Sequence, residues 1–282
     1  MQLKRLVPNF LKPAMKKVYF FTVDIIDAAK GRDFLTPPKS LIFIGSGDYK
    51  QIGNEFKKYF IDFGGLKPHH RVLDVGCGIG RMAVPLTDYL TSEGGYWGFD
   101  IVKKGIEWCQ KYITPNFNHF HFQHVNIYNK YYNKKGNIVA DQFGFPYETN
   151  FFDFVFLTSV FTHMQSDELE NYIKEIARVL KPEGKAILTF FLLNSESKRL
   201  IDQGNSVFDF KYAITENCKT TNLDVPEDAI AYEEKFVMSL INKHGLIIDQ
   251  PIQYGSWCGR ETFLTSQDLV IIRKQDHVYS DP

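Results

Sequence analysis

The stretch Arg71-Val-Leu-Asp-Val-Gly-Cys-Gly-Ile-Gly-Arg81 constrains the fold more than any other part of this 282-residue sequence. Residues 72–75 form a short run that is apolar except for Asp74 and β-branched at both ends, which predicts a buried parallel strand. Glycine then occupies every second position, at Gly76, Gly78 and Gly80, where the backbone must turn sharply and let a ligand approach without a Cβ in the way. From residue 81 to residue 90 the apolar spacing predicts a helix, and the N–H groups at its start favour an anion.

A second signal lies downstream, where residues 96–100 have the composition of the next strand and end in Asp100. In dinucleotide-type folds, an acid at the tip of the second strand accepts hydrogen bonds from ribose hydroxyls. The two signals together predict that Asp100 is a bidentate acceptor for the 2′- and 3′-hydroxyls of a bound nucleoside. The alternative is that Asp100 has a purely structural role.

The glycine spacing is G-x-G-x-G, whereas the pyrophosphate-binding fingerprint is G-x-G-x-x-G. With Asp74 just before it, the stretch resembles the first motif of the class I S-adenosylmethionine-dependent methyltransferases, an acid followed by x-G-x-G-x-G. Residues 152–159, 178–184 and 266–272 resemble that family's fourth strand, the segment before its fifth strand and its last strand. The resemblance implies the fold and the cofactor, S-adenosylmethionine, and says little about the methyl acceptor.

Strands and helices alternate along the chain, which predicts a mostly parallel sheet with right-handed crossovers. No helix separates the last two predicted strands, residues 246–251 and 269–273, and the resemblance implies that this pair is antiparallel. We therefore expect a Rossmann-like α/β fold with seven strands, an antiparallel last strand and helices on both faces. The other predicted strands are residues 72–75, 96–100, 119–125, 152–158 and 186–191, with helices at 81–90, 103–113, 166–180 and 231–244.

Two regions lie outside this pattern. Residues 1–70 are expected to form a helical extension, with helices at 13–30 and 49–63, and by analogy with similar methyltransferases we interpret it as a lid over cofactor and substrate. The methyltransferase domain is expected to span residues 71–282. Within it, residues 194–230 are polar, irregular and too long for a plain loop, which indicates a functional insertion or a mobile lid.

Composition limits the class of partner. The 33 basic and 33 acidic residues balance, so no nucleic-acid partner is expected. The segment after the fourth strand also lacks the Asn/Asp-Pro-Pro-Tyr type of sequence, since Thr158-Ser-Val-Phe stands there. The aromatic content of 15% indicates that some rings line a pocket, with an aromatic-rich core as the alternative. The sequence neither predicts nor excludes a homodimer.

The cysteines and the N-terminal sequence suggest a location. The four cysteines form no C-x-x-C pair, which fits a reduced, cytoplasmic compartment. There is no secretory signal and no stretch long enough to span a membrane, so stable membrane insertion is not expected. The basic N-terminus could touch an anionic membrane, although an ordinary solvated helix face is the favoured interpretation.

The resemblance implies a set of cofactor contacts. Asp74 would contact the cofactor amino group or fix the glycine loop, and Arg81 would pair with the cofactor carboxylate or face solvent. After the third strand this chain has Asn126 and Ile127 where the family usually has an acid, and the Asn126 carbonyl oxygen can still accept a hydrogen bond from adenine. The remaining expected contacts are Gly76, Cys77, Gly78 and Gly80 near the methionine part, Ile101 on the adenine, and Thr158 at the end of the fourth strand.

Three residues are candidates for chemistry and substrate binding. His163 lies just past the fourth strand and is either a general base or a loop histidine bonded to the backbone. Trp257 and Arg260 follow the sixth strand and would either grip a ring and an anionic or hydroxyl-rich group, or form a packed turn. No metal site is expected, because the alternating histidines of the third strand lack an acidic partner.

These observations predict an enzyme that transfers a methyl group from S-adenosylmethionine to a hydroxyl of a small molecule or saccharide. Methylation of a small amine is the first alternative. An NAD-dependent oxidoreductase on a similar fold is the second, and the glycine spacing argues against it. A binding protein without turnover is the third.

Overall fold

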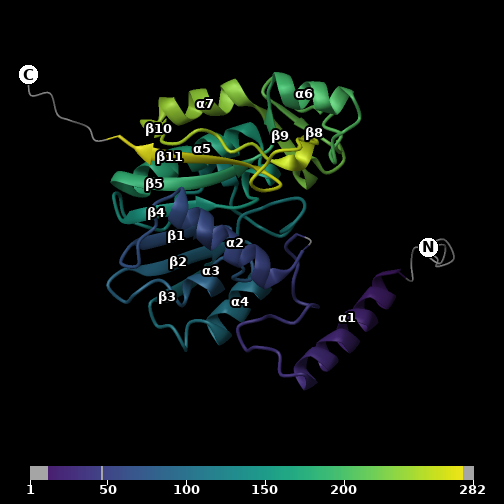
Figure 1. The fold of residues 1–282 in the computed structure, drawn as a ribbon, viewed down its shortest axis with the longest axis vertical. Helices are drawn as coiled ribbons and strands as arrows, with labels where there is room; N and C mark the ends of the chain where they lie inside the picture. Colours follow the sequence, from purple (N-terminus) through teal and green to yellow (C-terminus); the bar gives the residue numbers. More distant parts are fainter. Residues whose placement is uncertain (1–11, 46, 276–282) are drawn as a thin grey trace, which may run out of the picture.

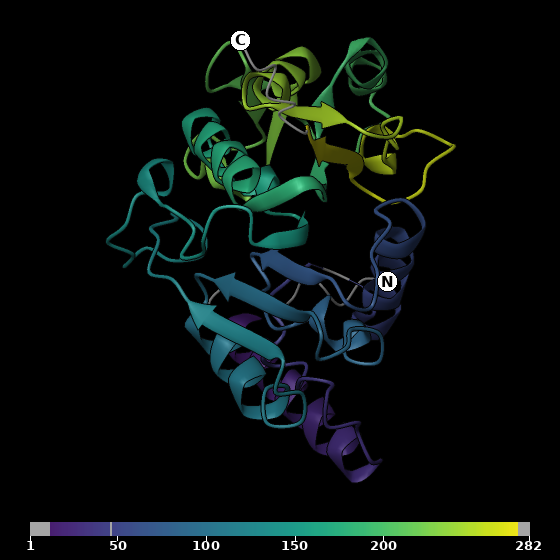
Figure 2. The same ribbon diagram turned by 90° about the vertical axis from the view of Figure 1, so that its left-hand side faces the viewer.

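The computed structural model describes residues 12–45 and 47–275, with side chains from residue 18 onward. Figure 1 shows a central sheet with helices on both faces. Figures 1 and 2 both place helix α1 (Lys12–Ala29) at the opposite end of the molecule from α6 (Ser195–Asp202) and α7 (Glu234–Lys243). Within the described ranges, no helix is both long enough and apolar enough to cross a bilayer.

The central sheet has seven strands in the order β10-β11-β5-β4-β1-β2-β3. Neighbouring strands run parallel except at β11, which is antiparallel to both β10 and β5. This confirms the predicted fold class, including the antiparallel last strand. The strands are β1 (Arg71–Val75), β2 (Gly95–Asp100), β3 (Phe120–His124), β4 (Phe152–Leu157), β5 (Leu180–Phe190), β10 (Leu246–Ile248) and β11 (Asp268–Lys274).

Each face of the sheet has its own hydrophobic core, because successive side chains of a strand point to opposite faces. In β1, Val72 packs into the cluster that also contains Phe60 of α2 (Tyr49–Asp62), whereas Leu73 packs into the cluster that contains Leu169 of α5 (Ser166–Val179). The first face is covered by α2, α3 (Ala83–Leu86) and α4 (Lys103–Tyr112), and the second by α5 and α7.

The topology defines where a ligand binds. From β1 the chain adds β2 and β3 on one side and then returns to add β4 and β5 on the other. The strand order therefore reverses between β1 and β4, and ligands of open α/β sheets bind at the carboxyl ends of the strands at such a switch point.

Two helix predictions were too long. The helix predicted at residues 81–90 is only Ala83–Leu86. Pro85 has no N–H to donate to the Arg81 carbonyl, so the helical hydrogen bonds cannot begin at Arg81. The helix predicted at 231–244 begins at Glu234, because Ile230–Glu233 pairs with a neighbouring strand instead.

A segment of residues 192–233, which spans the predicted insertion at 194–230, folds as a second, smaller layer. Its strands form a four-stranded sheet in the order β6-β9-β8-β7, with β6 (Leu192–Leu193), β7 (Tyr212–Ala213), β8 (Cys218–Thr220) and β9 (Ile230–Glu233). Phe191, Phe210 and Trp257 are buried in a third hydrophobic cluster beside it. Four short 3₁₀ segments complete the described chain: η2 (Ala140–Gln142), η3 (Phe161–His163), η4 (Pro226–Asp228) and η5 (Ser256–Cys258).

Candidate cofactor and acceptor site

A cavity of about 500 Å³ lies at the carboxyl ends of β1, β2 and β4. This volume is within the usual range for small-molecule and cofactor sites. Asp74 and Gly76 line it from β1, Asp100 from β2, and Thr158 and Ser159 from β4. Ser159 has φ +59, a left-handed conformation that is uncommon for serine and that concentrates at functional sites. The cavity therefore lies where the topology places a ligand.

The glycine turn is held against the end of β2. The Gly76 and Cys77 N–H groups donate to the Phe99 carbonyl at 2.9 and 3.0 Å, and the Gly78 N–H donates to Asp100 Oδ2 at 2.8 Å. Gly76 has φ +78, and a Cβ there would come within 2.4 Å of Val160 Cγ2. The turn thus needs glycine for its backbone conformation and for the space beside the cavity. Gly80 does not line the cavity; a Cβ there would meet Ile113 and Cys109 at the buried side of α4.

Asp100 is buried and fixed by two backbone donors. Its Oδ2 accepts the Gly78 N–H, and its Oδ1 accepts the Val102 N–H at 2.6 Å. Each carboxylate oxygen can accept more than one hydrogen bond, so both keep acceptor capacity toward the cavity. Burial raises the pKa of Asp100 to about 6, while the N–H donors of Val102 and Gly78 oppose that rise. The carboxylate is therefore mostly ionised at neutral pH and oriented as an acceptor.

Asp74 is more deeply buried, at 1% exposure. The Tyr96 hydroxyl donates to its Oδ2, whereas its Oδ1 has no hydrogen-bond partner. Burial raises the pKa of the Asp74 carboxyl to about 8, against the Tyr96 hydrogen bond, which lowers it. A buried acceptor without a partner costs free energy, so a donor supplied from the cavity would be favourable here.

This buried acid predicts a pH-dependent stability. The folded protein retains the Asp74 proton up to about pH 8, whereas the unfolded chain releases it near 3.8, so the free energy of unfolding falls as pH rises through this window. Asp74→Asn keeps an oxygen for the Tyr96 hydroxyl but has no charge. We expect this variant to be more stable than wild type at pH 8 by at least about 1 kcal/mol, with the difference shrinking toward pH 4. Urea denaturation at several pH values measures this, and a difference independent of pH would contradict it.

Arg81 lines the cavity as a buried cation. Its Nη2 donates to the Ile44 carbonyl at 2.7 Å, and its Nε has no partner. Within the part of the chain that the structure describes, it makes no ion pair. Burial lowers the pKa of Arg81, against the influence of Tyr49 and Asp48. An anionic group in the cavity would satisfy both its charge and its Nε donor.

The other expected cofactor contacts divide into two groups. Cys77, Ile101, Ile127 and Thr158 line the cavity. Asn126 does not: its Nδ2 donates to Asn137 Oδ1 at 2.9 Å, and its Oδ1 accepts from Asn133 Nδ2 at 3.3 Å. Because loop residues that follow β3 already occupy both ends of this amide, we do not propose it as an adenine contact.

His163 lies on the cavity wall in η3. Its Nδ1 lies 2.7 Å from the Glu227 carbonyl oxygen, which can only accept, so Nδ1 carries the proton and Nε2 is the free acceptor. The Tyr132 hydroxyl is 3.5 Å from Nε2, and the Tyr131 ring is stacked on the imidazole. Burial lowers the pKa of His163 below 6.5, so the ring is neutral at neutral pH.

Several cavity residues were not predicted from the sequence. Tyr132 belongs to the loop of residues 128–143, whose polar, Lys-rich sequence favours a surface position. The structure nevertheless places Tyr132 at the cavity, and Asn129 Oδ1 accepts the Tyr131 and Tyr132 N–H groups. The only feature of the sequence that could have indicated a role for Tyr132 in the cavity is the presence of other aromatic residues beside it. The N-terminal segment and the insertion also supply walls of the cavity: Phe43, Ile44, Gly45, Ile52, Phe56, Phe208, Asp228 and Ala229.

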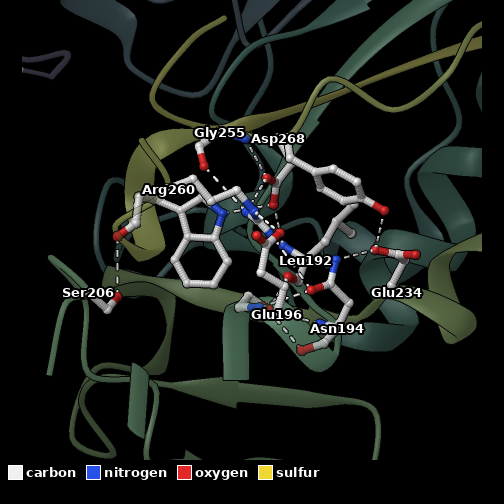
Figure 3. A network of polar contacts seen from close by, with 11 residues as sticks. Leu192, Asn194, Glu196, Ser206, Glu234, Gly255, Arg260 and Asp268 are labelled. Atoms are coloured by element: carbon white, nitrogen blue, oxygen red, sulfur yellow. Dashed lines mark hydrogen bonds and ion pairs between the residues drawn. The ribbon is translucent and has the colours of Figure 1, made fainter. Parts of the chain in front are cut away.

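Trp257 and Arg260 do not line the cavity. Both belong to a polar network around the buried Asp268, in which Trp257 Nε1 donates to Asp268 Oδ2 at 2.8 Å and Arg260 Nη1 to Oδ1 at 3.3 Å. Figure 3 shows Arg260 and Asp268 in this network. The Leu192 and Gly255 N–H groups donate to the same carboxylate, and Arg260 also pairs with Glu196. The network joins β11 to the insertion. Trp257 and Arg260 therefore lie in a packed turn, which was the alternative to a role in substrate binding.

The network predicts a large effect on stability. Asp268→Ala leaves Arg260 and three N–H groups in the interior without their acceptor, so we expect the free energy of unfolding to fall by about 3–5 kcal/mol. Glu196→Ala removes the exposed partner of the same arginine and should cost about 1 kcal/mol or less. Urea denaturation of the two variants tests this, and equal losses would show that the Asp268 carboxylate has no special role.

The sequence was compared with known proteins. Residues 73–188 match the family model described as a methyltransferase domain. The sterol 24-C-methyltransferase of Schizosaccharomyces pombe is 35% identical over 43% of this chain and 27% of its own length. The 2-phytyl-1,4-naphthoquinone methyltransferase of Trichormus variabilis is 26% identical over 55% of this chain and 63% of its own. The chain thus spans less than two thirds of each of these relatives.

Solved structures show the same fold. A methyltransferase of Methanosarcina mazei superposes with a TM-score of 0.53 at 21% identity, covering 76% of this chain and 97% of that one. The magnesium protoporphyrin IX methyltransferase of Synechocystis, solved with bound S-adenosylhomocysteine, gives a TM-score of 0.51 at 15% identity over 92% and 100% of the chains. Residues 73–188 therefore match a methyltransferase domain, and the chain has the fold of these solved methyltransferase structures.

Proposed function

We propose that this protein transfers a methyl group from S-adenosylmethionine to a hydroxyl of a small molecule or saccharide. The observation that carries the proposal is the glycine turn bonded through Gly78 to Asp100 at the wall of a cofactor-sized cavity. When bound, the cofactor supplies an activated methyl group on its sulfonium.

The residues around the cavity fit this cofactor chemically. Asp100 presents fixed acceptor oxygens for ribose hydroxyls. An ammonium group at the unpartnered Asp74 Oδ1 would favour the ionised carboxylate and so displace the proton that burial otherwise retains there. Arg81 is a buried cation without an acidic partner in the described residues, which suits a carboxylate. Two carboxyl groups and one cation therefore match the hydroxyl, ammonium and carboxylate groups of an amino acid joined to a nucleoside.

His163 is proposed to accept the proton that a hydroxyl acceptor loses. His163 lines the cavity, and the hydrogen bond from its Nδ1 to the Glu227 carbonyl leaves Nε2 unprotonated. The Tyr132 hydroxyl lies 3.5 Å from Nε2, where it can contact the acceptor hydroxyl or the ring. The protein's other contribution is to orient the acceptor and exclude water.

We propose that the N-terminal extension covers the site; of residues 1–70, residues 1–11 and 46 lie outside the described part of the chain. Phe43 and Ile44 lie in the connector between α1 and α2. Together with Ile52 and Phe56 of α2 they form one wall of the cavity, and the Arg81 guanidinium donates to the Ile44 carbonyl. The described part of α1 contributes no residue to that wall. The covering part of the extension is therefore the connector and α2.

An amine acceptor is the second candidate. Glu168 and Asp228 line the cavity beside Tyr131 and Tyr132, and acids next to aromatic rings favour a cationic ligand. The phosphoethanolamine N-methyltransferase 3 of Arabidopsis thaliana, 30% identical over 51% of this chain and 26% of its own length, acts on such an amine by its name.

Calorimetry followed by a transfer assay tests the proposal. S-adenosylhomocysteine should bind with a micromolar Kd and NADH should not. Radiolabelled methyl transfer to matched panels of sugars, phenols and small amines then separates hydroxyl from amine acceptors. Binding of NADH in place of S-adenosylhomocysteine would overturn the proposal in favour of an oxidoreductase.

A further inference from the structure

Helix α1 turns its apolar side chains toward solvent, the reverse of an ordinary surface helix. Val18, Tyr19, Phe21, Ile25 and Ile26 are 66%, 64%, 65%, 54% and 46% exposed. At 3.6 residues per turn these five positions fall on one continuous arc of the helix. The predicted apolar stripe is present, but it does not cover the rest of the protein.

The acids of the same helix hold this orientation. Asp24 accepts the Lys39 and Ser40 N–H groups at 2.6 and 3.1 Å, and Asp27 pairs with Lys39 Nζ at 3.5 Å. Arg32 also lies 3.9 Å from Asp24. The polar side of α1 is thus fastened to the connector that follows it. Rotating the helix to bury its apolar arc would break these contacts.

The sequence around the arc is basic. Although acids and bases balance over the whole chain, residues 1–17 contain no acid. Their cations are Lys4, Arg5, Lys12, Lys16 and Lys17. A cluster of bases directly before an apolar helix face has the charge that complements an anionic lipid surface.

We propose that the apolar arc of α1, with the basic sequence before it, binds the surface of an anionic lipid bilayer. A second copy of the chain is a poorer occupant, because the arc is too small. From Val18 to Ile26 it is about 12 Å long and roughly 10 Å wide, whereas a stable interface buries about 800 Å² per partner. A lipid surface needs no such area, since a helix lying in the headgroup region buries its apolar face there.

The connector between α1 and α2 links the lipid-binding arc to the cavity wall. The chain that leaves α1 continues through Phe34, which is 55% exposed, to Phe43 and Ile44, which line the cavity. Lipid binding by α1 and the basic sequence before it does not depend on the proposed reaction.

Vesicle sedimentation of the full-length chain tests the inference. Wild type should bind phosphatidylcholine vesicles that contain one third phosphatidylglycerol, and binding should be much weaker to pure phosphatidylcholine vesicles. The double variant Phe21→Ser, Ile25→Ser should lower the partition coefficient at least about tenfold. Lys16→Glu with Lys17→Glu should lower it by a similar factor on anionic vesicles only.

Matched controls use exposed apolar residues elsewhere. Phe263 and Leu223 are 54% and 56% exposed and lie outside α1, so Phe263→Ser with Leu223→Ser should bind vesicles as wild type does. Failure of wild type to bind anionic vesicles would overturn the inference, as would equal losses in the α1 and control variants. Sedimentation equilibrium without lipid completes the test: a dimer abolished by Phe21→Ser, Ile25→Ser would assign the arc to a second copy instead.

Discussion

Replacing Asp100 by alanine is expected to weaken the binding of S-adenosylhomocysteine by at least about 100-fold. The carboxylate is proposed to accept two ribose hydroxyls, and hydrogen bonds to a charged group contribute about 1.5–3 kcal/mol each. It also holds the glycine turn through the Gly78 N–H at 2.8 Å. Isothermal titration calorimetry measures the change, and thermal melting shows whether the variant remains folded.

A modified ligand separates the two roles of Asp100. The 2′,3′-dideoxy analogue of S-adenosylhomocysteine cannot donate to the carboxylate, so it should bind wild type and Asp100→Ala with much more similar affinity than the parent ligand does. Glu107→Ala is a control, since Glu107 is an exposed acid on the adjacent helix α4. If Asp100→Ala binds S-adenosylhomocysteine as wild type does, Asp100 is not the ribose acceptor.

Replacing His163 by alanine is expected to lower kcat for a hydroxyl acceptor by about 10²–10⁴-fold, the usual contribution of a positioned general base. The Kd of S-adenosylhomocysteine should change little, because the proposed cofactor contacts lie on other residues. Steady-state transfer kinetics and calorimetry on the same variant give the two quantities. His121→Ala is the matched control, since His121 is an exposed histidine that does not line the cavity.

The pH profile gives an independent test of the base. His163 must be neutral to accept a proton, and burial lowers its pKa below 6.5. Measured at saturating cofactor, so that the titration of Asp74 and Asp100 does not limit binding, the wild-type kcat should be constant above about pH 7 and fall as pH drops through the lowered pKa of His163. Tyr132→Phe removes the hydroxyl next to Nε2 and should move this inflection while the variant stays active. Full-rate methylation by His163→Ala would exclude the base role.

The nucleotide half of the site was predictable from the sequence. A β-branched strand, alternating glycines and an acid closing the next strand are neighbours along the chain, and each depends on local backbone geometry. The parallel strands were predictable from the alternation of strands and helices with right-handed crossovers, whereas the antiparallel β11 was expected from the family resemblance. Asp74, Gly76, Gly78, Arg81 and Asp100 accordingly meet at one cavity.

The acceptor half was decided by contacts between segments that are distant in sequence. Trp257 and Arg260 follow a strand end that points toward the site, but the Asp268 carboxylate draws both into the interior. Asn126 is taken by two asparagines of its own loop, while Tyr132 from that loop reaches the cavity. Local patterns do not specify such partners, because a buried polar group adopts whichever available arrangement satisfies its hydrogen bonds.

In the N-terminal extension, too, the sequence predicts some features and the tertiary structure decides others. The helical period of α1 and α2 was evident from the sequence, since it depends only on the spacing of apolar residues. Which way each apolar face points was settled by the tertiary structure. In α2, Phe60 is buried against Phe154 and Phe156 of β4, whereas the acids of α1 bind the connector and leave its apolar arc in solvent. Periodicity determines that a face exists, and only the packing of the whole chain determines what that face meets.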